Sequence, residues 1–182
     1  MNVKIEDMSS VRIKNGVKQV ERTLGVVPSA HLIGLTKIVL VDVITEPRIS
    51  TSDRSTLPAL YHPKMGGQTA WAEIATTILL PKKKISERFM SRLTIKPNLA
   101  QVVLSLVAQH YHFTLARGIK KTEIERACRA YTEKYSEKWR ESQGGLRMRL
   151  TKPFRPTLDR WAKKLSKKYK KEVEKKNKSK TK

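Results

Sequence analysis

The sequence predicts an α+β fold, in which a small antiparallel sheet is packed by helices and a basic helical arm follows. Two segments rich in β-branched residues flank a long polar connection. Apolar residues recur at helical spacing on both sides of these segments. Cationic side chains accumulate late in the 182-residue chain. We therefore expect a core over residues 1–146 and a basic arm over residues 147–182, a length that suits one domain with an appended segment.

The first half of the chain predicts one helix and two strands. Apolar residues at helical spacing predict a helix over residues 11–24, and Gly25 can end it. Residues 35–44 predict a buried strand. Residues 48–67 carry serine, threonine, proline and a Gly-Gly pair, which predict a loop. A second strand is then expected over residues 71–80.

The second half predicts helices. A basic connector begins at residue 82 and ends near Pro97, so that Asn98 is a candidate N-cap for a central helix over residues 98–117. Thr122 and Glu125 have the spacing of a capping box and predict the start of the next helix. Residues 152–156 predict a stiff linker and residues 157–173 a last helix, while residues 177–182 should be disordered.

The formal charge of +23 is unevenly distributed. Residues 1–80 hold 9 basic and 7 acidic side chains, whereas residues 147–182 hold 16 and 3, a net charge of +13. Such a segment binds phosphate polymers, so we expect a nucleic acid, DNA or RNA, as the partner. The expected contact residues are Arg147, Arg149, Lys152, Arg155, Arg160, Trp161, Lys163, Lys164, Lys167, Lys168, Lys170 and Lys171. Lysine dominates from Lys163 onward, which favours contact without sequence preference.

Several classes of protein do not fit this composition. The single Cys128 excludes an intramolecular disulfide scaffold and a zinc finger. The first ten residues include Glu6 and Asp7 and do not predict a secretory signal, so we expect a cytoplasmic protein. A basic helix could also lie on an anionic membrane, but the apolar face predicted for residues 157–173 is narrow, so nucleic acid is the favoured partner. No cofactor is expected.

The segment His110-Tyr111-His112 is the one histidine cluster and allows three interpretations. In a strand both histidines would share a face, as in a His-hydrophobic-His nuclease, and Tyr131 or Tyr135 could attack the DNA phosphate. In a helix only one of them could bind zinc beside another ligand. The favoured interpretation is a packed helix in which His110 makes a core hydrogen bond and His112 is solvated, because no carboxylate is adjacent and helical periodicity continues on both sides.

A family resemblance covers roughly residues 11–140. The sequence Val-Pro-Ser-Ala-His-Leu-Ile-Gly-Leu at residues 27–35 leads into a strand, and Leu60-Tyr61-His62-Pro63 precedes the second strand. The central helix and the helix that begins with Glu123-Ile124-Glu125 follow. This order resembles small zinc-dependent metallopeptidase (zincin-like) domains. The resemblance implies a His-Glu-x-x-His motif on the central helix and a glutamate ligand on the next helix.

The zinc-binding motif itself is absent. If His110 matches the second histidine of the family, Leu106 and Val107 stand at the positions of the first histidine and the catalytic glutamate. Glu123 or Glu125 could stand at the position of the third ligand. The resemblance therefore implies a scaffold that has lost its metal, and the leading hypothesis is a non-enzymatic protein associated with nucleic acid. One alternative is a metal-dependent hydrolase that uses His110, His112 and Glu125, either as a residual peptidase or as the nuclease. The other alternative is a subunit of a larger ribonucleoprotein or phage-type assembly.

Overall fold

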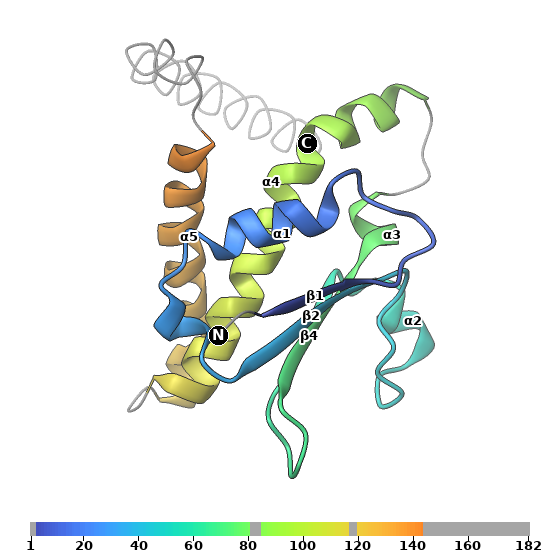
Figure 1. The fold of residues 1–182 in the computed structure, drawn as a ribbon. Helices are drawn as coiled ribbons and strands as arrows, with labels where there is room; N and C mark the ends of the chain where they lie inside the picture. The colour runs from blue at the N-terminus through green and yellow to red at the C-terminus, as the bar shows by residue number, and fades with distance from the viewer. Residues whose placement is uncertain (1–2, 81–84, 117–119, 144–182) are drawn as a thin grey trace, which may run out of the picture. The chain divides into compact units, whose positions relative to one another are not determined.

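The computed structural model describes residues 3–80, 85–116 and 120–143 (Figure 1). The chain divides into two compact units, Met1–Ser142 and Gln143–Lys182. The arm, linker and tail predicted over residues 147–182 lie outside the described residues, as do the twelve predicted nucleic-acid contacts. The first unit combines a four-stranded sheet with helices, which confirms the α+β class.

The elements follow one another in a simple order. The described chain forms β1 (Lys4–Asp7), α1 (Gly16–Leu24), the 3-10 helix η1 (Ser29–Leu32), β2 (Leu35–Val41), α2 (Thr51–Arg54), β3 (Ala59–His62), β4 (Ala70–Ala75), α3 (Thr76–Leu79), α4 (Ile85–His110), the π-helix η2 (Tyr111–Leu115), the 3-10 helix η3 (Lys121–Glu123) and α5 (Ile124–Ser142). Residues 71–80 thus form a strand only as far as Ala75, after which the chain turns into α3. Residues 48–67, predicted as a loop, contain α2 and β3.

The sheet is mixed, which corrects the prediction of an antiparallel sheet. Its strand order is β1-β2-β4-β3, with β1 and β4 both parallel to β2 and β3 antiparallel to β4. The two strands predicted from sequence, β2 and β4, are therefore parallel neighbours. The chain between them forms β3 at the edge of the sheet and then reverses direction. β1 and β3 have four residues each, too few to show a clear two-residue period.

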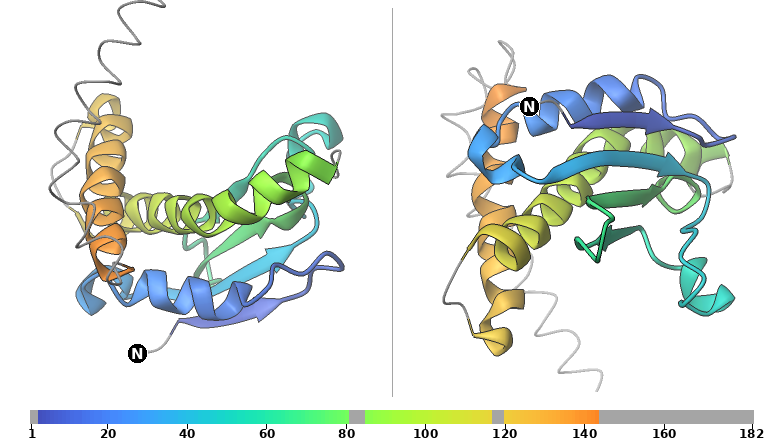
Figure 2. Two further views of the ribbon diagram at one scale, coloured as in Figure 1. Left: turned by 90° about the horizontal axis from the view of Figure 1, so that it is seen from above. Right: turned by 60° about the horizontal axis from the view of Figure 1, so that its bottom comes forward.

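The two faces of the sheet are covered differently (Figure 2). Alternate residues such as Ile38 on β2 and Ile74 on β4 join the main core, together with Val20 of α1 and Val103 of α4. The opposite face carries a smaller cluster of Val39, Val41, Ile44 and Ala75, with Leu57, Leu60, Trp71 and Ile78 packed against it. Most of the apolar surface is thus buried under α1 and α4, and the segment after β2 covers part of the other face.

The central helix starts earlier than predicted. Instead of residues 98–117, α4 spans Ile85–His110, and Pro97 lies inside it, so Asn98 is not an N-cap. A proline removes one backbone hydrogen bond from a helix interior. The buried residues Leu99, Val103 and Val107, one turn apart on one face, anchor the helix in the core on the C-terminal side of Pro97.

The other helix boundaries agree in part with the predictions. The first helix begins at Gly16 rather than residue 11, and Gly25 follows it as the C-cap, as predicted. Thr122 lies within η3, whose N-cap is Lys120, so the predicted capping box does not start α5. A 3-10 turn can begin a helix without a side-chain cap. Trp139 joins Tyr131 and Tyr135 on the buried face of α5.

Candidate functional site

His110 is a buried structural residue at the end of α4, as the favoured interpretation expected. Its Nε2 lies 3.0 Å from the carbonyl oxygen of Ile33, and its Nδ1 lies 2.9 Å from the hydroxyl of Tyr61. A carbonyl only accepts, so Nε2–H donates to Ile33 and Nδ1 accepts from Tyr61. Burial lowers the pKa of His110, and the bond to Ile33 partly opposes this shift. Both nitrogens are therefore engaged in joining α4 to β3 and to the end of η1.

The backbone beside Ile33 fits this connection. Gly34 has a φ of 90°, a conformation that glycine adopts without strain. A Cβ added at Gly34 would lie 3.8 Å from Cε1 of His110, which is ordinary van der Waals contact. The need for glycine therefore comes from the turn that presents the Ile33 carbonyl to His110, and not from crowding.

His112 belongs to an aromatic cluster at the docking site of α5. It lies in the π-helix η2 and is half-buried, which corrects the prediction that it is solvated. Neither ring nitrogen makes a hydrogen bond of good geometry with a described residue, and its ring packs edge-on against Tyr111 and Tyr131. Burial lowers the pKa of His112, with a smaller opposing effect from the backbone of Ala127. The helical backbone at residues 110–112 does not provide the strand that a His-hydrophobic-His nuclease requires.

His31 completes this cluster from η1. Its Nδ1 lies 2.8 Å from the Tyr131 hydroxyl, and its ring packs against Tyr111 at a tilt of 35° with centroids 4.2 Å apart. Burial lowers the pKa of His31, and repulsion from Lys134 and from His112 when it is protonated lowers it further. Burial also raises the pKa of Tyr131. The cluster thus consists of neutral rings that hold α5 against η1 and η2.

The predicted metal-binding residues do not converge. Glu125 is exposed on α5 and lies 3.4 Å from Arg129, as a side-chain pair on one helix face. Glu123 is exposed at the end of η3. Within the described residues, no group of three or more His, Cys, Asp and Glu side chains could hold a metal ion. His110 therefore makes hydrogen bonds in the core, whereas Glu125 is exposed to solvent.

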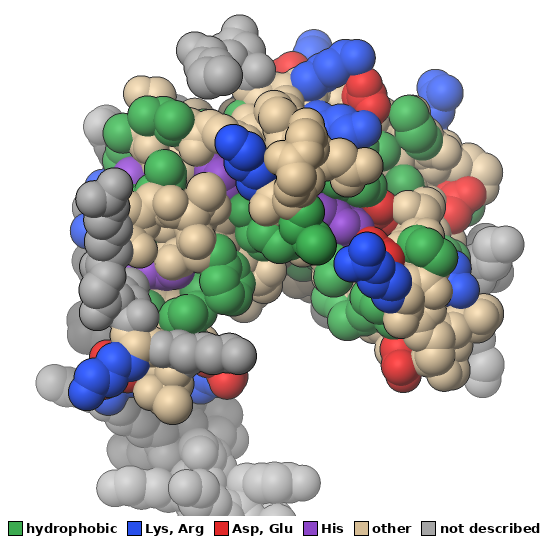
Figure 3. Space-filling model, turned by 90° about the horizontal axis from the view of Figure 1, so that it is seen from below, with side chains coloured by type: hydrophobic (Ala, Val, Ile, Leu, Met, Phe, Trp, Pro, Cys, Tyr) green, Lys and Arg blue, Asp and Glu red, His purple; other side chains and the backbone are tan. Residues whose placement is uncertain are grey.

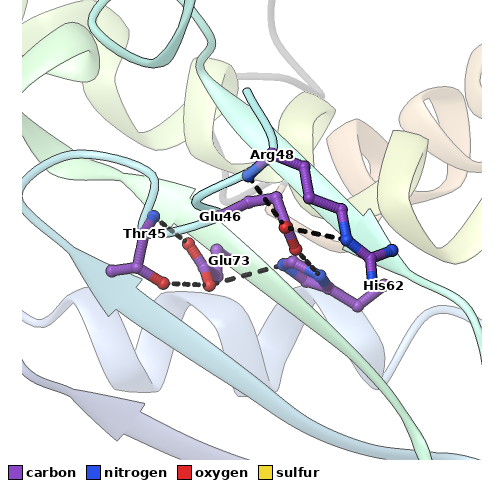
Figure 4. A network of polar contacts seen from close by, with 5 residues as sticks. All are labelled: Thr45, Glu46, Arg48, His62 and Glu73. Atoms are coloured by element: carbon purple, nitrogen blue, oxygen red, sulfur yellow. Dashed lines mark hydrogen bonds and ion pairs between the residues drawn. The ribbon is translucent and has the colours of Figure 1, made fainter. Parts of the chain in front are cut away.

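A polar cluster that no sequence motif predicts lies on the opposite face of the sheet. Glu73, in the middle of β4, is 1% exposed. Its carboxylate accepts hydrogen bonds from the backbone N–H of Thr45 at 2.7 Å and from the Thr45 hydroxyl at 2.6 Å. Hydrogen bonds to a charged group contribute about 1.5–3 kcal/mol. Glu73 therefore holds the segment that follows β2 against the sheet (Figure 4).

His62 connects this buried carboxylate to a second one (Figure 4). Its Nε2 lies 3.4 Å from Oε1 of Glu73, and its Nδ1 lies 3.5 Å from Oε2 of Glu46. The ring stacks on Trp71 with centroids 4.0 Å apart, and Lys37 lies over the same indole at 4.9 Å. Each imidazole nitrogen faces a carboxylate, so His62 lies between two acids, although its Nε2 makes no hydrogen bond with a described residue.

The surroundings of this cluster appear on the face shown in Figure 3, where histidine lies next to carboxylate, Lys and Arg side chains. Arg48 lies 3.9 Å from Glu46 at the edge of the cluster. The one signal in the sequence was a glutamate inside an apolar strand, because a buried acid must find partners. Those partners, Thr45 and His62, are 28 and 11 residues away along the chain and show no fixed spacing.

Comparisons with known proteins place no further constraint on the function. Protein-family models, curated proteins and solved structures gave no significant match to this chain. Within the described residues, no helix is both long and apolar enough to cross a membrane. The charge pattern and the contacts described above are therefore the basis for a functional proposal.

Proposed function

We propose that this chain is a non-enzymatic, nucleic-acid-associated protein whose zincin-like body holds no metal. Binding is dominated by residues 147–176, and the observation that carries the proposal is the net charge of +13 within residues 147–182. A polycation of this density releases counterions from a phosphate backbone when it binds. Lysine-rich segments make point-charge contacts, so DNA and RNA are both candidate ligands and no sequence preference is expected.

The environment of His110 supports a non-catalytic body. In the zincin-like resemblance, His110 stands where the second zinc-binding histidine would be, yet its two ring nitrogens are bonded to Ile33 and Tyr61. A zinc ligand needs a free imidazole nitrogen and two further protein ligands. Leu106, one turn before His110, is buried and apolar. This arrangement supports a structural role for the helix that carries the catalytic motif in the family.

Fluorescence anisotropy with a labelled duplex DNA and a labelled single-stranded RNA tests the proposal. The full chain should bind both, and its affinity should fall steeply with salt, by about 10³–10⁵ between 50 and 200 mM if six to ten phosphates are contacted. A full-length variant with Lys163, Lys164, Lys167, Lys168, Lys170 and Lys171 replaced by glutamine should lose most of the affinity. Unchanged affinity in this variant would contradict the proposal. Metal analysis of protein purified without chelators checks the enzyme alternative, because stoichiometric zinc or manganese would support a hydrolase.

A further inference from the structure

A group of exposed cations lies on α1 and just before it. Four of the nine Lys and Arg residues in residues 1–80 fall between Arg12 and Arg22, and Glu21 is the one carboxylate among them. All four cations, Arg12, Lys14, Lys18 and Arg22, are exposed. None of them forms an ion pair with another residue in the part of the chain that the structure describes. We call these four residues the α1 cationic surface.

The packing of α1 turns this surface toward solvent. Val20, Thr23 and Leu24 form the buried side of the helix, against α4 and the sheet. Lys18 and Arg22 are four residues apart, so they lie one turn from each other on the outer side. The helix rises 1.5 Å per residue, which separates their backbones by about 6 Å along the axis. α1 lies beside α4 over one face of the sheet (Figure 2), and Lys18 and Arg22 are exposed on its outer side.

The cations at the N-terminal end of α1 disfavour the helix, whereas Arg22 in its last turn is favourably placed for the dipole. The first turn of α1 has no acidic residue, and Asn15 makes no side-chain cap. The positive end of the helix dipole therefore lies close to Lys14 and Lys18, where negative charge would stabilise it. Like charges such as Lys18 and Arg22 at this spacing destabilise a helix by about 0.2–0.5 kcal/mol. An external polyanion would relieve both effects.

We propose that the α1 cationic surface is a second contact for the phosphate backbone of nucleic acid. This inference rests on the proposed function and extends binding from the C-terminal residues onto the folded body. A lipid surface is a poorer fit, because the exposed residues of α1 are Lys18, Glu21 and Arg22, while its apolar residues Val20 and Leu24 are buried and Val17 is half-buried. An interfacial helix needs an exposed apolar face.

The salt dependence of binding by the full chain measures these contacts. The variant Lys14→Gln/Lys18→Gln/Arg22→Gln should lower the slope of log K against log salt by about 2 to 3 for duplex DNA, since each phosphate contact contributes about 0.9. The matched control is Lys64→Gln/Lys96→Gln/Lys120→Gln, which removes the same charge from three exposed residues on separate segments. Its slope should change by less than about 1. Circular dichroism should show the same helix content in all three proteins.

Each other outcome has a defined meaning. A wild-type slope in the α1 variant, together with lost affinity in the C-terminal lysine variant, would overturn this inference and leave the proposed function intact. An equal loss of slope in the α1 variant and its control would also overturn it, because net charge would then explain the effect. No binding of DNA or RNA by the full chain would overturn the proposed function itself. The same variant can be tested with phosphatidylserine vesicles. If the α1 variant bound nucleic acid like the wild type but no longer bound the vesicles, the surface would be assigned to lipid and the inference would be overturned.

Discussion

At the scale of single residues, Glu73 shows how one buried charge can set the position of a long segment. It lies on β4, yet its two hydrogen bonds go to Thr45, just beyond β2. A buried charge is costly unless it is paired and hydrogen-bonded. Here Thr45 and His62 supply those partners, so that a polar residue in an apolar strand fixes where the chain goes after β2.

We predict that Glu73→Gln destabilises the protein by about 1.5–3 kcal/mol, because glutamine offers Thr45 one acceptor oxygen where the carboxylate offers two. Urea unfolding followed by circular dichroism measures this change. Glu133→Gln on the exposed side of α5 is the matched control and should stay within about 0.5 kcal/mol of the wild type. Equal unfolding midpoints for Glu73→Gln and the wild type would show that the carboxylate charge contributes nothing.

The hydroxyl of Tyr61 supports a second residue-scale prediction. It lies 2.9 Å from Nδ1 of His110 and 3.1 Å from the hydroxyl of Thr114. Tyr61→Phe removes the donor to a buried ring nitrogen, which should cost about 1–3 kcal/mol in the same unfolding measurement. Tyr111→Phe is the control, because no hydrogen bond joins its hydroxyl to another described residue. If both variants lost the same stability, ring packing rather than the Tyr61 hydrogen bond would be the cause.

At the scale of elements, the accuracy of a prediction depends on the length of the element and on how far along the chain its contacts lie. α1 is long enough to show its helical period, and β2 is a long run rich in β-branched residues, so both are recognisable from sequence. β1 and β3 are four residues each and exist because β2 and β4 offer them hydrogen-bond partners. The start of α4 before Pro97 also escapes local rules, because a proline usually ends a helix at the preceding residue.

In the candidate site, too, the features set by local sequence could be predicted and those set by distant contacts could not. The core role of His110 could be inferred from its place among Leu106, Val107 and other apolar residues at helical spacing. Its partners Tyr61 and Ile33 could not, since they are 49 and 77 residues away along the chain. His112 was expected in solvent because the docking of α5 is a tertiary contact. The Glu73 cluster was missed altogether, since it joins three separate segments.

The docking of α5 through neutral histidines leads to a prediction of acid sensitivity. Burial lowers the pKa of His31, His110 and His112 below the ordinary value of 6.5, so the unfolded chain binds protons more readily than the folded one. This stability is fully present above about pH 6.5 and is lost as the pH falls below that value. On protonation, His31 and His112 would repel each other, and Lys134 would add to the effect on His31.

Urea unfolding at pH 7.5, 6.5 and 5.5 measures this effect. The free energy of unfolding should fall on acidification, by at most about 1.4 kcal/mol per pH unit for each additional proton bound by the unfolded state. The double variant His31→Phe/His112→Phe should show a shallower dependence, although the loss of the bond to Tyr131 lowers its stability at pH 7.5. An equally steep dependence in the double variant would show that other groups control the acid response.

At the scale of the whole molecule, the core that the structure describes and the densest positive charge belong to different parts of the chain. The residues of the main core run from Ile13 to Trp139, all within the first compact unit. The densest positive charge lies after residue 146. High net charge favours solubility and association with polyanions but says little about the fold. Folding and polyanion binding should therefore be separable by deletion.

We predict that residues 1–146 alone unfold in urea with the same midpoint and slope as the full chain, to within about 0.5 kcal/mol in free energy at 0.15 M salt. The reason is that the apolar side chains of the two described core clusters all lie in this part of the chain. Its net charge is +10 instead of +23, since residues 147–182 carry +13. The truncated protein should keep only the weaker affinity of the α1 cationic surface for duplex DNA. A lower urea slope after truncation would mean that residues 147–182 bury surface against the body, and that folding and binding are not separable.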